Sequence, residues 1–425
     1  MPTRTNGAKV RLGGLVHAAR GLWASGRKYS VGAFCPSYLV EQARNYLTQH
    51  GCQEFILLGE VTGAPNVVAI ADVREVGHQG YEDILRDERR VVPLYNDMDL
   101  SRFNYVVIFP GRYNIESILK KFQSGANITI DVAYDINDAK FLRELTNKIA
   151  SLVISTSSQL FSTLASVDIN PLIEISKDIG VKNLLLKENR GGSRLFDLAT
   201  NDVEYITATL GTTANSVGVG DVFTAVFGTL EDSACNAAWR GMQVATIYSQ
   251  TTWPDDLRRD VKRQLQLPIN IVRNLGGVSL PWHIRPDLQI YLAAPDFSYA
   301  DHEEIAAAVA ALEYHNFRVR RPVKENGEAD RDSPIESLAV YYFNDVQLLR
   351  ECSVVFAVPI ERDPGTLVEI GLAIEMGKPV ITFDPRQENR NTMVVKGSIT
   401  YSSDLDICLN GTFDALSKII QGTLS

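Results

Sequence analysis

The chain has 425 residues, of which 45% are hydrophobic and 22% charged, and its formal net charge is −9. This length predicts two or three domains of ordinary globular composition. No long run of Lys or Arg supplies phosphate neutralisation, which argues against a nucleic-acid partner. No apolar run reaches about 18 residues, so we expect no membrane span. The five cysteines are scattered without a Cys-x-x-Cys pair, and residues 1–11 are polar. We therefore expect a cytoplasmic protein without a signal peptide, disulfide framework or zinc knuckle.

Strand and helix patterns alternate along residues 1–268, which we interpret as the first domain. Short β-branched or apolar runs predict strands, and amphipathic stretches between them predict helices. The alternation favours a layered α/β domain with a mostly parallel sheet. The predicted strands are 54–58, 66–70, 105–109, 128–132, 152–155 and 183–186, and the predicted helices are 115–122, 139–149 and 172–179.

A glycine-rich segment at 215–225 opens a helix near the end of this domain. Its Gly218-Val219-Gly220 turn lets backbone amides approach an anion, and the helix adds its positive end. Asp221 follows directly and is placed to take a proton from a hydroxyl that attacks a phosphate. A plain glycine turn with Asp221 as helix cap explains the same residues.

The segment resembles the Gly-x-Gly-Asp signature of the ribokinase/PfkB family of carbohydrate and nucleoside kinases. Gly13-Gly14, ahead of a helix predicted at 17–24, resembles the family's N-terminal substrate-binding Gly-Gly element, and the order of elements agrees across 11–264. The resemblance implies a ribokinase-like fold, Asp221 as catalytic base, residues 218–220 as anion hole, and ATP with Mg²⁺ as cofactors if the domain is active.

Several family elements are absent from this sequence. Only about ten polar residues precede Gly13, no lid is evident, and 155–162 lacks the Asn and Glu that organise magnesium in the family. The glycine-rich nucleotide turn is blurred at 187–192, and Asn215 and His17 stand where the family has Asp and Asn. An active kinase and a ligand-binding or scaffolding remnant both remain open.

Prolines and glycines mark residues 269–287 as a linker between domains. A second domain is expected at 288–425, with strands at 289–293, 317–319, 353–358 and 380–383 and helices at 301–314 and 333–350. This pattern predicts a smaller, Rossmann-like (flavodoxin-like) parallel-sheet domain. Its ligand site is expected outside the carboxyl ends of the strands.

Two carboxylates, Asp363 and Glu369, follow the strand at 353–358 and fall at that edge. Pro364 and Gly365 break the chain, and Thr366 is expected to cap the next helix. Thr366-x-x-Glu369 also fits a capping box, in which the glutamate only satisfies a helix amide. The pattern by itself does not choose between a cap and a site.

The surrounding motifs resemble the nucleoside 2-deoxyribosyltransferase family and the related nucleotide N-glycosidases. The resemblance covers 289–385 and rests on four ordered motifs: Ile-Tyr-Leu-Ala-Ala-Pro at 290–295, Asn344-Asp345, Asp-x-Gly-x-x-x-Glu-x-Gly-x-Ala at 363–373, and Gly-Lys-Pro-Val at 377–380.

The resemblance implies a covalent glycosyl intermediate on Glu369, which a helix N-terminus would keep anionic at neutral pH. Asp345 would contact the base and protonate it, Asp363 would bind sugar hydroxyls, and Tyr291 would orient the nucleophile. Gly365 and Asn344 complete the predicted substrate site. The six histidines show no metal-ligand spacing, so no metal site is expected.

We therefore predict a nucleoside- or nucleotide-processing enzyme, a homo-oligomer that cleaves or exchanges an N-glycosidic bond and needs no cofactor in that domain. Hydrolysis and transfer remain open, as does an N-terminal nucleoside kinase activity. The alternatives are a PfkB-type nucleoside or sugar kinase with a structural C-terminal domain, a nucleotide sensor without turnover, and an NAD⁺ glycohydrolase.

Overall fold

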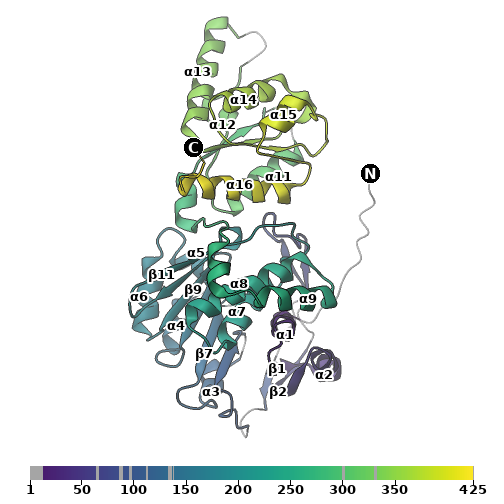
Figure 1. The fold of residues 1–425 in the computed structure, drawn as a ribbon, viewed down its shortest axis with the longest axis vertical. Coiled ribbons are helices and arrows are strands. Elements are labelled where there is room, and N and C mark those ends of the chain that lie inside the picture. Colours follow the sequence, from purple (N-terminus) through teal and green to yellow (C-terminus); the bar gives the residue numbers. More distant parts are fainter. Residues whose placement is uncertain are drawn as a thin grey trace.

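A computed structural model of the protein describes residues 13–63, 67–85, 90–94, 98–111, 113–132, 136, 138–298, 302–329 and 333–424. Figure 1 shows two α/β regions stacked along the long axis, with the C-terminal one above the N-terminal one. Among the helices of these residues, none is both long and apolar enough to cross a bilayer.

The N-terminal region is built on a six-stranded sheet with the order β11-β10-β9-β8-β7-β6. Neighbouring strands from β6 to β9 pair in parallel, and β10 and β11 add an antiparallel edge. The strands are β6 (Tyr105–Ile108), β7 (Asn127–Val132), β8 (Ser151–Ser155), β9 (Asn183–Lys187), β10 (Ser193–Asp197) and β11 (Val203–Ile206).

Helices cover both faces of this sheet because alternate strand residues are apolar on each side. Val153 and Leu185 pack with α1, α7 and α8, whereas Ile130 and Ile154 pack with α3 to α6. The helices are α1 (Gly14–Ala24), α2 (Val40–Gln49), α3 (Ile115–Leu119), α4 (Ala139–Glu144), α5 (Gln159–Leu164), α6 (Asn170–Asp178), α7 (Val219–Thr229), α8 (Ala234–Gln250), α9 (Pro254–Leu265) and α10 (Ile269–Asn274).

Two small sheets complete this region. The sequence predicted strands at 54–58 and 66–70 but did not predict that they belong to separate sheets. One has the order β1-β2-β5, and a hairpin pairs β3 with β4. Their strands are β1 (Tyr29–Cys35), β2 (Cys52–Thr62), β3 (Val67–Ile70), β4 (Tyr81–Leu85) and β5 (Arg90–Pro93). Residues 72–79, between β3 and β4, lie against the C-terminal region, and we call them the strap.

The C-terminal region is a five-stranded sheet, β13-β12-β14-β15-β16, in which every pairing is parallel. The predicted class, a layered α/β region followed by a smaller Rossmann-like parallel-sheet region, is confirmed. The strands are β12 (Ile290–Ala293), β13 (Val319–Arg320), β14 (Val354–Ala357), β15 (Val380–Phe383) and β16 (Thr400–Ser402), and the helices are α11 (Glu303–Tyr314), α12 (Pro322–Asn326), α13 (Ile335–Glu351), α14 (Pro364–Glu375), α15 (Thr392–Gly397) and α16 (Leu405–Ile420).

Strand alternation divides the residues of β12 between two cores. Ile290 and Leu292 face α11 and α16, and Tyr291 and Ala293 face α13 and α14. Tyr291 therefore reaches the helix that carries Glu369, on the sheet face that points away from the N-terminal region.

Candidate functional sites

The glutamate site forms where β12 and α14 meet. Tyr291 is fully buried, and its hydroxyl donates a 2.5 Å hydrogen bond to Oε1 of Glu369. Glu369 lies in the second turn of α14, so its side chain points back over the mouth of the sheet. Two residues that are 78 positions apart are thus brought into direct contact.

Asp363, and not Thr366, is the N-cap of α14, which corrects our expectation of a Thr366 cap and argues against the alternative of a capping box with Glu369. Oδ2 of Asp363 accepts hydrogen bonds from the amide of Thr366 at 2.7 Å and from its hydroxyl at 2.8 Å. Pro364 fits the first helical position because its missing N–H would have no acceptor there. Glu369 therefore takes no part in capping α14, and its carboxyl group can act in the site.

Burial raises the pKa of Glu369 to about 8. The Tyr291 hydrogen bond lowers this pKa, and the charges of Asp345 and Asp363 raise it further. This raised pKa differs from our expectation that the helix end keeps Glu369 anionic at neutral pH, because burial disfavours the charged form of the carboxyl group.

Asp345 comes from α13 and lines the same cavity. Its Oδ1 accepts a 2.8 Å hydrogen bond from Nδ2 of Asn326, and burial raises its pKa. A carboxyl group with a raised pKa can hold the proton that a leaving base needs.

The cavity around these groups measures about 350 Å³. It is lined by residues of β12, α13 and the start of α14: Tyr291, Tyr342, Asp345, Val346, Leu349, Pro364, Gly365, Val368, Glu369 and Leu372. The predicted residue Gly365 is among them, whereas Asn344 is exposed and Asp363 caps the helix beside the cavity. The structure thus brings Tyr291, Asp345, Gly365 and Glu369 together and leaves Asn344 outside.

The glycine turn forms a second site in the N-terminal region. Gly218 adopts a left-handed conformation with φ 83°, and α7 begins at the next residue. Gly14 packs directly against Asp221, since a Cβ built at Gly14 would lie 2.9 Å from Oδ2 of Asp221. The two glycine motifs predicted from sequence are therefore neighbours, although a Cβ at Gly13 would meet no atom within 4 Å.

Asp221 is buried, and burial raises its pKa to about 7, with the charge of Asp131 adding to the effect and Lys187 opposing it. Nζ of Lys187 lies 2.6 Å from Oδ2 of Asp131 and 3.2 Å from the hydroxyl of Thr224. Sequence reasoning did not single out Lys187 or Asp131. The signal available was a charged residue at the end of each of two predicted parallel strands, where ligand sites gather.

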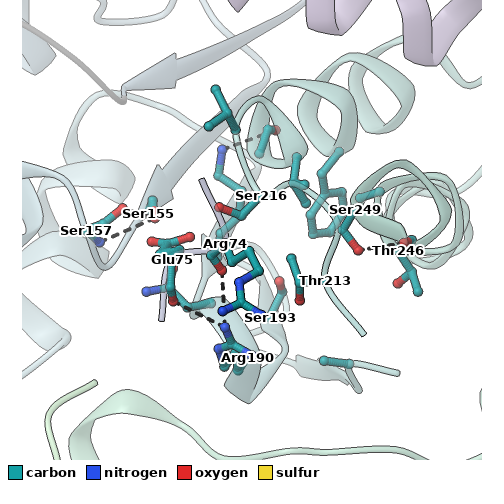
Figure 2. A pocket seen from close by; sticks show the side chains of 18 of the residues that line it. Arg74, Glu75, Ser155, Ser157, Arg190, Ser193, Thr213, Ser216, Thr246 and Ser249 are labelled. Carbon is teal, nitrogen blue, oxygen red and sulfur yellow. Dashed lines mark hydrogen bonds between the residues drawn. The ribbon is translucent and has the colours of Figure 1, made fainter. Parts of the chain in front are cut away.

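The second cavity measures about 470 Å³ and lies between the two regions. It is lined by residues 216–221, Lys187, the strap and residues of α8, and also by Tyr314 and Asn410 of the C-terminal region. Figure 2 shows Ser155, Ser157, Ser216, Thr213, Thr246 and Ser249 around it, with Arg74, Glu75 and Arg190 along one side. Glu369 and Asp221 thus belong to different cavities. In the described ranges, no group of three or more His, Cys, Asp or Glu residues is arranged to hold a metal ion.

Residues 290–404 match the family model for nucleoside 2-deoxyribosyltransferases. The match includes Tyr291, Asp345, Asp363 and Glu369, and it confirms the resemblance of the C-terminal region to this enzyme family.

Solved structures of both predicted families are similar to parts of the chain. A ribokinase from Giardia lamblia is 13% identical, with a TM-score of 0.46, and the match covers 61% of this chain and 92% of that one. A Burkholderia thailandensis nucleoside kinase in complex with inosine is 11% identical, with a TM-score of 0.43 and coverages of 60% and 84%. A 2-deoxyribosyltransferase from Bacillus psychrosaccharolyticus is 25% identical, with a TM-score of 0.24 and coverages of 28% and 88%. No curated protein matches the chain.

Proposed function

We propose that the C-terminal region cleaves or exchanges the N-glycosidic bond of a nucleoside or nucleotide, with Glu369 as nucleophile. The observation that carries this proposal is the buried Tyr291–Glu369 hydrogen bond in a cavity that also contains Asp345. The family match over 290–404 supports the same chemistry.

In the first step, the Glu369 carboxylate attacks C1′ of the sugar, and the bond between C1′ and the base nitrogen breaks. The base takes the electron pair of that bond and a proton from Asp345, whose pKa is raised by burial. Tyr291 holds one carboxylate oxygen and leaves the other free to attack. This step forms an ester between the sugar and Glu369.

In the second step, water or a second base attacks C1′, and Glu369 leaves as a carboxylate. Asp345, now ionised, can take the proton from the incoming nucleophile, as in retaining glycosidases. Oδ2 of Asp363 accepts the hydrogen bond of the helix cap, so Oδ1 is the oxygen of Asp363 that would contact a sugar hydroxyl. Gly365 lines the cavity and leaves space beside the sugar.

The test is incubation of the protein with a panel of nucleosides, nucleotides and NAD⁺, with free base or nicotinamide measured by chromatography. We expect the wild-type protein to release base, Glu369→Gln to release none, and Asp345→Asn to release it about 100-fold more slowly. Acid quenching followed by intact-mass measurement should find the sugar on the wild-type protein and not on Glu369→Gln. Absence of base release from a folded protein across the panel would refute the proposal.

A second candidate function, phosphorylation of a nucleoside or sugar by the N-terminal region, is favoured by Asp221 beside the glycine turn. Burial raises the pKa of Asp221 to about 7, which suits a general base. ATP-dependent phosphorylation that is lost in Asp221→Asn and kept in Glu369→Ala would support it.

We also propose that the protein assembles into a homo-oligomer through α13. Ile335, Tyr342 and Phe343 are 81%, 51% and 67% exposed, and Tyr342 also lines the Glu369 cavity. Contiguous exposed apolar side chains of this kind mark association surfaces. Light scattering should give a mass above that of one chain, and Phe343→Glu with Ile335→Glu should reduce it to one.

A further inference from the structure

The strap stands on a hairpin that belongs to neither main sheet. Among the described residues, β3 and β4 pair antiparallel with each other and with no other strand. A two-stranded hairpin is only marginally stable by itself in water. The position of the strap is therefore set by the contacts that it makes with the rest of the protein.

The strap has a fixed shape of its own. Oδ1 of Asp72 accepts a hydrogen bond from the amide of Arg74 at 2.9 Å, and Oδ2 accepts one from the amide of Val76 at 2.7 Å. The amides of Ala71 and Asp72 both donate to the carbonyl of Gln79, which closes the strap at its base. Because these bonds join residues 71–79 to one another, they can stay intact while the strap moves as a unit.

Three consecutive strap residues contact the C-terminal region. Nη1 of Arg74 lies 2.8 Å from Oδ2 of Asp404, which caps α16. The hydroxyl of Tyr314, the last residue of α11, donates to Oε1 of Glu75 at 2.8 Å. Val76 is buried in the same apolar cluster as residues of α11 and α16. The C-terminal region thus holds the strap, although the strap belongs to the N-terminal half of the chain.

The strap also holds the loop in front of α7. The amide of Ser216 donates to the carbonyl of Val73 at 2.7 Å, and Nε2 of Gln79 donates to the Ser216 hydroxyl at 2.9 Å. Nη2 of Arg190 donates to two strap carbonyls at 3.2 and 3.3 Å (Figure 2). The strap therefore connects the C-terminal region to the loop that leads into the glycine turn.

The strap forms one wall of the interdomain cavity, which is lined by Arg74, Glu75, His78 and Gln79. The ion pair that joins it to α16 is partly exposed, since the side chains of Arg74 and Asp404 are 36% and 34% exposed. Partly exposed ion pairs and single hydrogen bonds each contribute little to stability. Segments held by such contacts open locally far more often than the whole protein unfolds.

The linker side of the interface is held more firmly. Leu280 is fully buried in the C-terminal core, and Val278 and Ala208 exchange backbone hydrogen bonds of 2.8 and 2.9 Å. The buried guanidinium of Arg285 donates to three carbonyls from both regions and the linker. These contacts share no residue with the strap, so the regions can stay joined when the strap leaves its place.

We propose that the strap is a latch on the interdomain cavity, held closed by α11 and α16 and able to release while the two regions stay joined. The C-terminal region thereby controls access to a cavity of the N-terminal region. This device goes beyond the proposed glycosidic chemistry and does not depend on the activity of Glu369.

The test is residue-resolved hydrogen exchange of the full-length protein. The amide of Ser216 has a strap carbonyl as its acceptor, whereas the adjacent amides of Ala214 and Asn215 donate to the carbonyl of Ser249 of α8. The amide of Val278 is bonded on the linker side. Release of the strap should expose Ser216 without the other three amides, and separation of the regions should expose Val278 as well.

Two substitutions that weaken the strap contacts should accelerate this exchange. Tyr314→Phe removes the hydroxyl bonded to Glu75, and Asp404→Asn removes a charge but keeps a good helix cap. In the double variant, we expect exchange at Ser216 to be about tenfold faster than in wild type. Exchange at the amides that the strap does not protect should keep the wild-type rates.

The matched control is Tyr401→Phe combined with Asp414→Asn. The hydroxyl of Tyr401 donates to Oδ2 of Asp384 at 2.6 Å, and this tyrosine packs on the sheet face that points away from the interface. Asp414 is a half-exposed residue of α16 paired with Lys418. This variant also loses a tyrosine–carboxylate bond and a negative charge, but it keeps every strap contact, so Ser216 should exchange at the wild-type rate.

Access to the cavity is measured with Thr246→Cys, since Thr246 lines it. Alkylation of this cysteine by iodoacetamide is followed by the mass of the tryptic peptide 241–258, which contains no other cysteine. It should be about tenfold faster when Tyr314→Phe and Asp404→Asn are added. Unchanged alkylation would show that movement of the strap does not open the cavity and would overturn the proposal.

The proposal is also overturned if Ser216 is unprotected in the wild-type protein, if the double variant keeps the wild-type exchange rate there, or if Val278 accelerates together with Ser216. If the double variant does not fold, Tyr314→Phe alone gives the same comparison with an expected acceleration of about threefold. No substrate is used, so an inactive Glu369 site would not affect these results.

Discussion

Removal of the Tyr291 hydroxyl should shift the pH dependence of the Glu369 site. In the wild-type protein this hydroxyl donates a 2.5 Å hydrogen bond to Glu369 and lowers its pKa against the effect of burial, which leaves the pKa at about 8. A hydrogen bond to a charged group contributes about 1.5–3 kcal/mol. Because one pH unit corresponds to about 1.4 kcal/mol, Tyr291→Phe should raise the pKa of Glu369 by about one to two pH units.

The consequence is a rate loss that depends on pH. With a pKa near 8, about a tenth of Glu369 is ionised at pH 7, and the variant would leave about a hundredth or less ionised. We expect kcat/KM for base release at pH 7 to fall by about 10- to 100-fold, with much of the loss recovered above pH 9. The assay is base release from the best substrate of the panel between pH 5 and 10.

Tyr342→Phe is the matched control, because it removes a hydroxyl from the same cavity without touching Glu369. The apparent pKa of the ascending limb should stay at its wild-type value in this variant. Equal rate losses at all pH values in Tyr291→Phe would refute the argument, since they would mean that the hydroxyl does not act through the ionisation of Glu369.

Three further predictions concern stability. Glu369 has its pKa raised from 4.5 to about 8 on folding, so its contribution to stability is complete below pH 4.5 and is lost as pH rises through 8. The free energy of unfolding of Glu369→Gln, relative to that of wild type, should therefore rise by about 2–4 kcal/mol between pH 5 and pH 9 in denaturant unfolding. A difference between the two proteins that stays constant with pH would contradict this. Arg190→Ala should lower the stability by about 3–5 kcal/mol because it leaves Asp406, which is fully buried, without its 2.7 Å partner. Adding Asp406→Asn to this variant should recover part of the loss in thermal unfolding. If the effects of the two substitutions on stability are fully additive, the two residues do not stabilise each other. Gly218→Ala should cost more than about 2 kcal/mol because Gly218 has φ 83° and a Cβ there would collide with a histidine ring of α1, whereas Gly13→Ala should stay within about 0.5 kcal/mol by the same unfolding assay.

The glutamate site could be predicted from sequence because its residues belong to short, ordered motifs. Tyr291 is on a four-residue strand whose alternation decides which sheet face it joins, and Glu369 lies on the helix that follows the next strand of the sheet. Asn344 failed as a cavity residue for a geometric reason. It is adjacent to Asp345 on a helix, and consecutive helical residues point about 100° apart, so Asn344 faces solvent although Asp345 lines the cavity.

The capping of α14 and the pKa of Glu369 show where local patterns are insufficient. Thr366 and Asp363 are both good capping residues, and the sequence does not say at which one the helix begins. The ionisation of Glu369 depends on its burial, and β12 and α13 contribute to that burial together with its own helix.

Two ion pairs were beyond sequence reasoning because each joins residues far apart in the chain, one of them between the two regions and the other within the N-terminal region. Arg190 and Asp406 are 216 positions apart, and Lys187 and Asp131 are 56 positions apart. Neither pair has a periodic or spacing signal. A charged residue at a strand end indicates the edge of the sheet on which it lies, but it does not identify the residue with which it forms an ion pair.

Buried charged side chains form hydrogen bonds across the interface between the regions. The guanidinium of Arg285 is fully buried and donates to the carbonyls of Glu188, Leu280 and His315, which joins the N-terminal region to the end of α11. Such groups cannot slide over one another without losing partners in a medium of low polarity. The two regions therefore meet in a defined orientation, with α11 and α16 on the interface side of the C-terminal sheet. Tyr291 and Glu369 lie on the opposite side of that sheet, so any influence of the interdomain cavity on the glutamate site would have to pass through β12 and its neighbours.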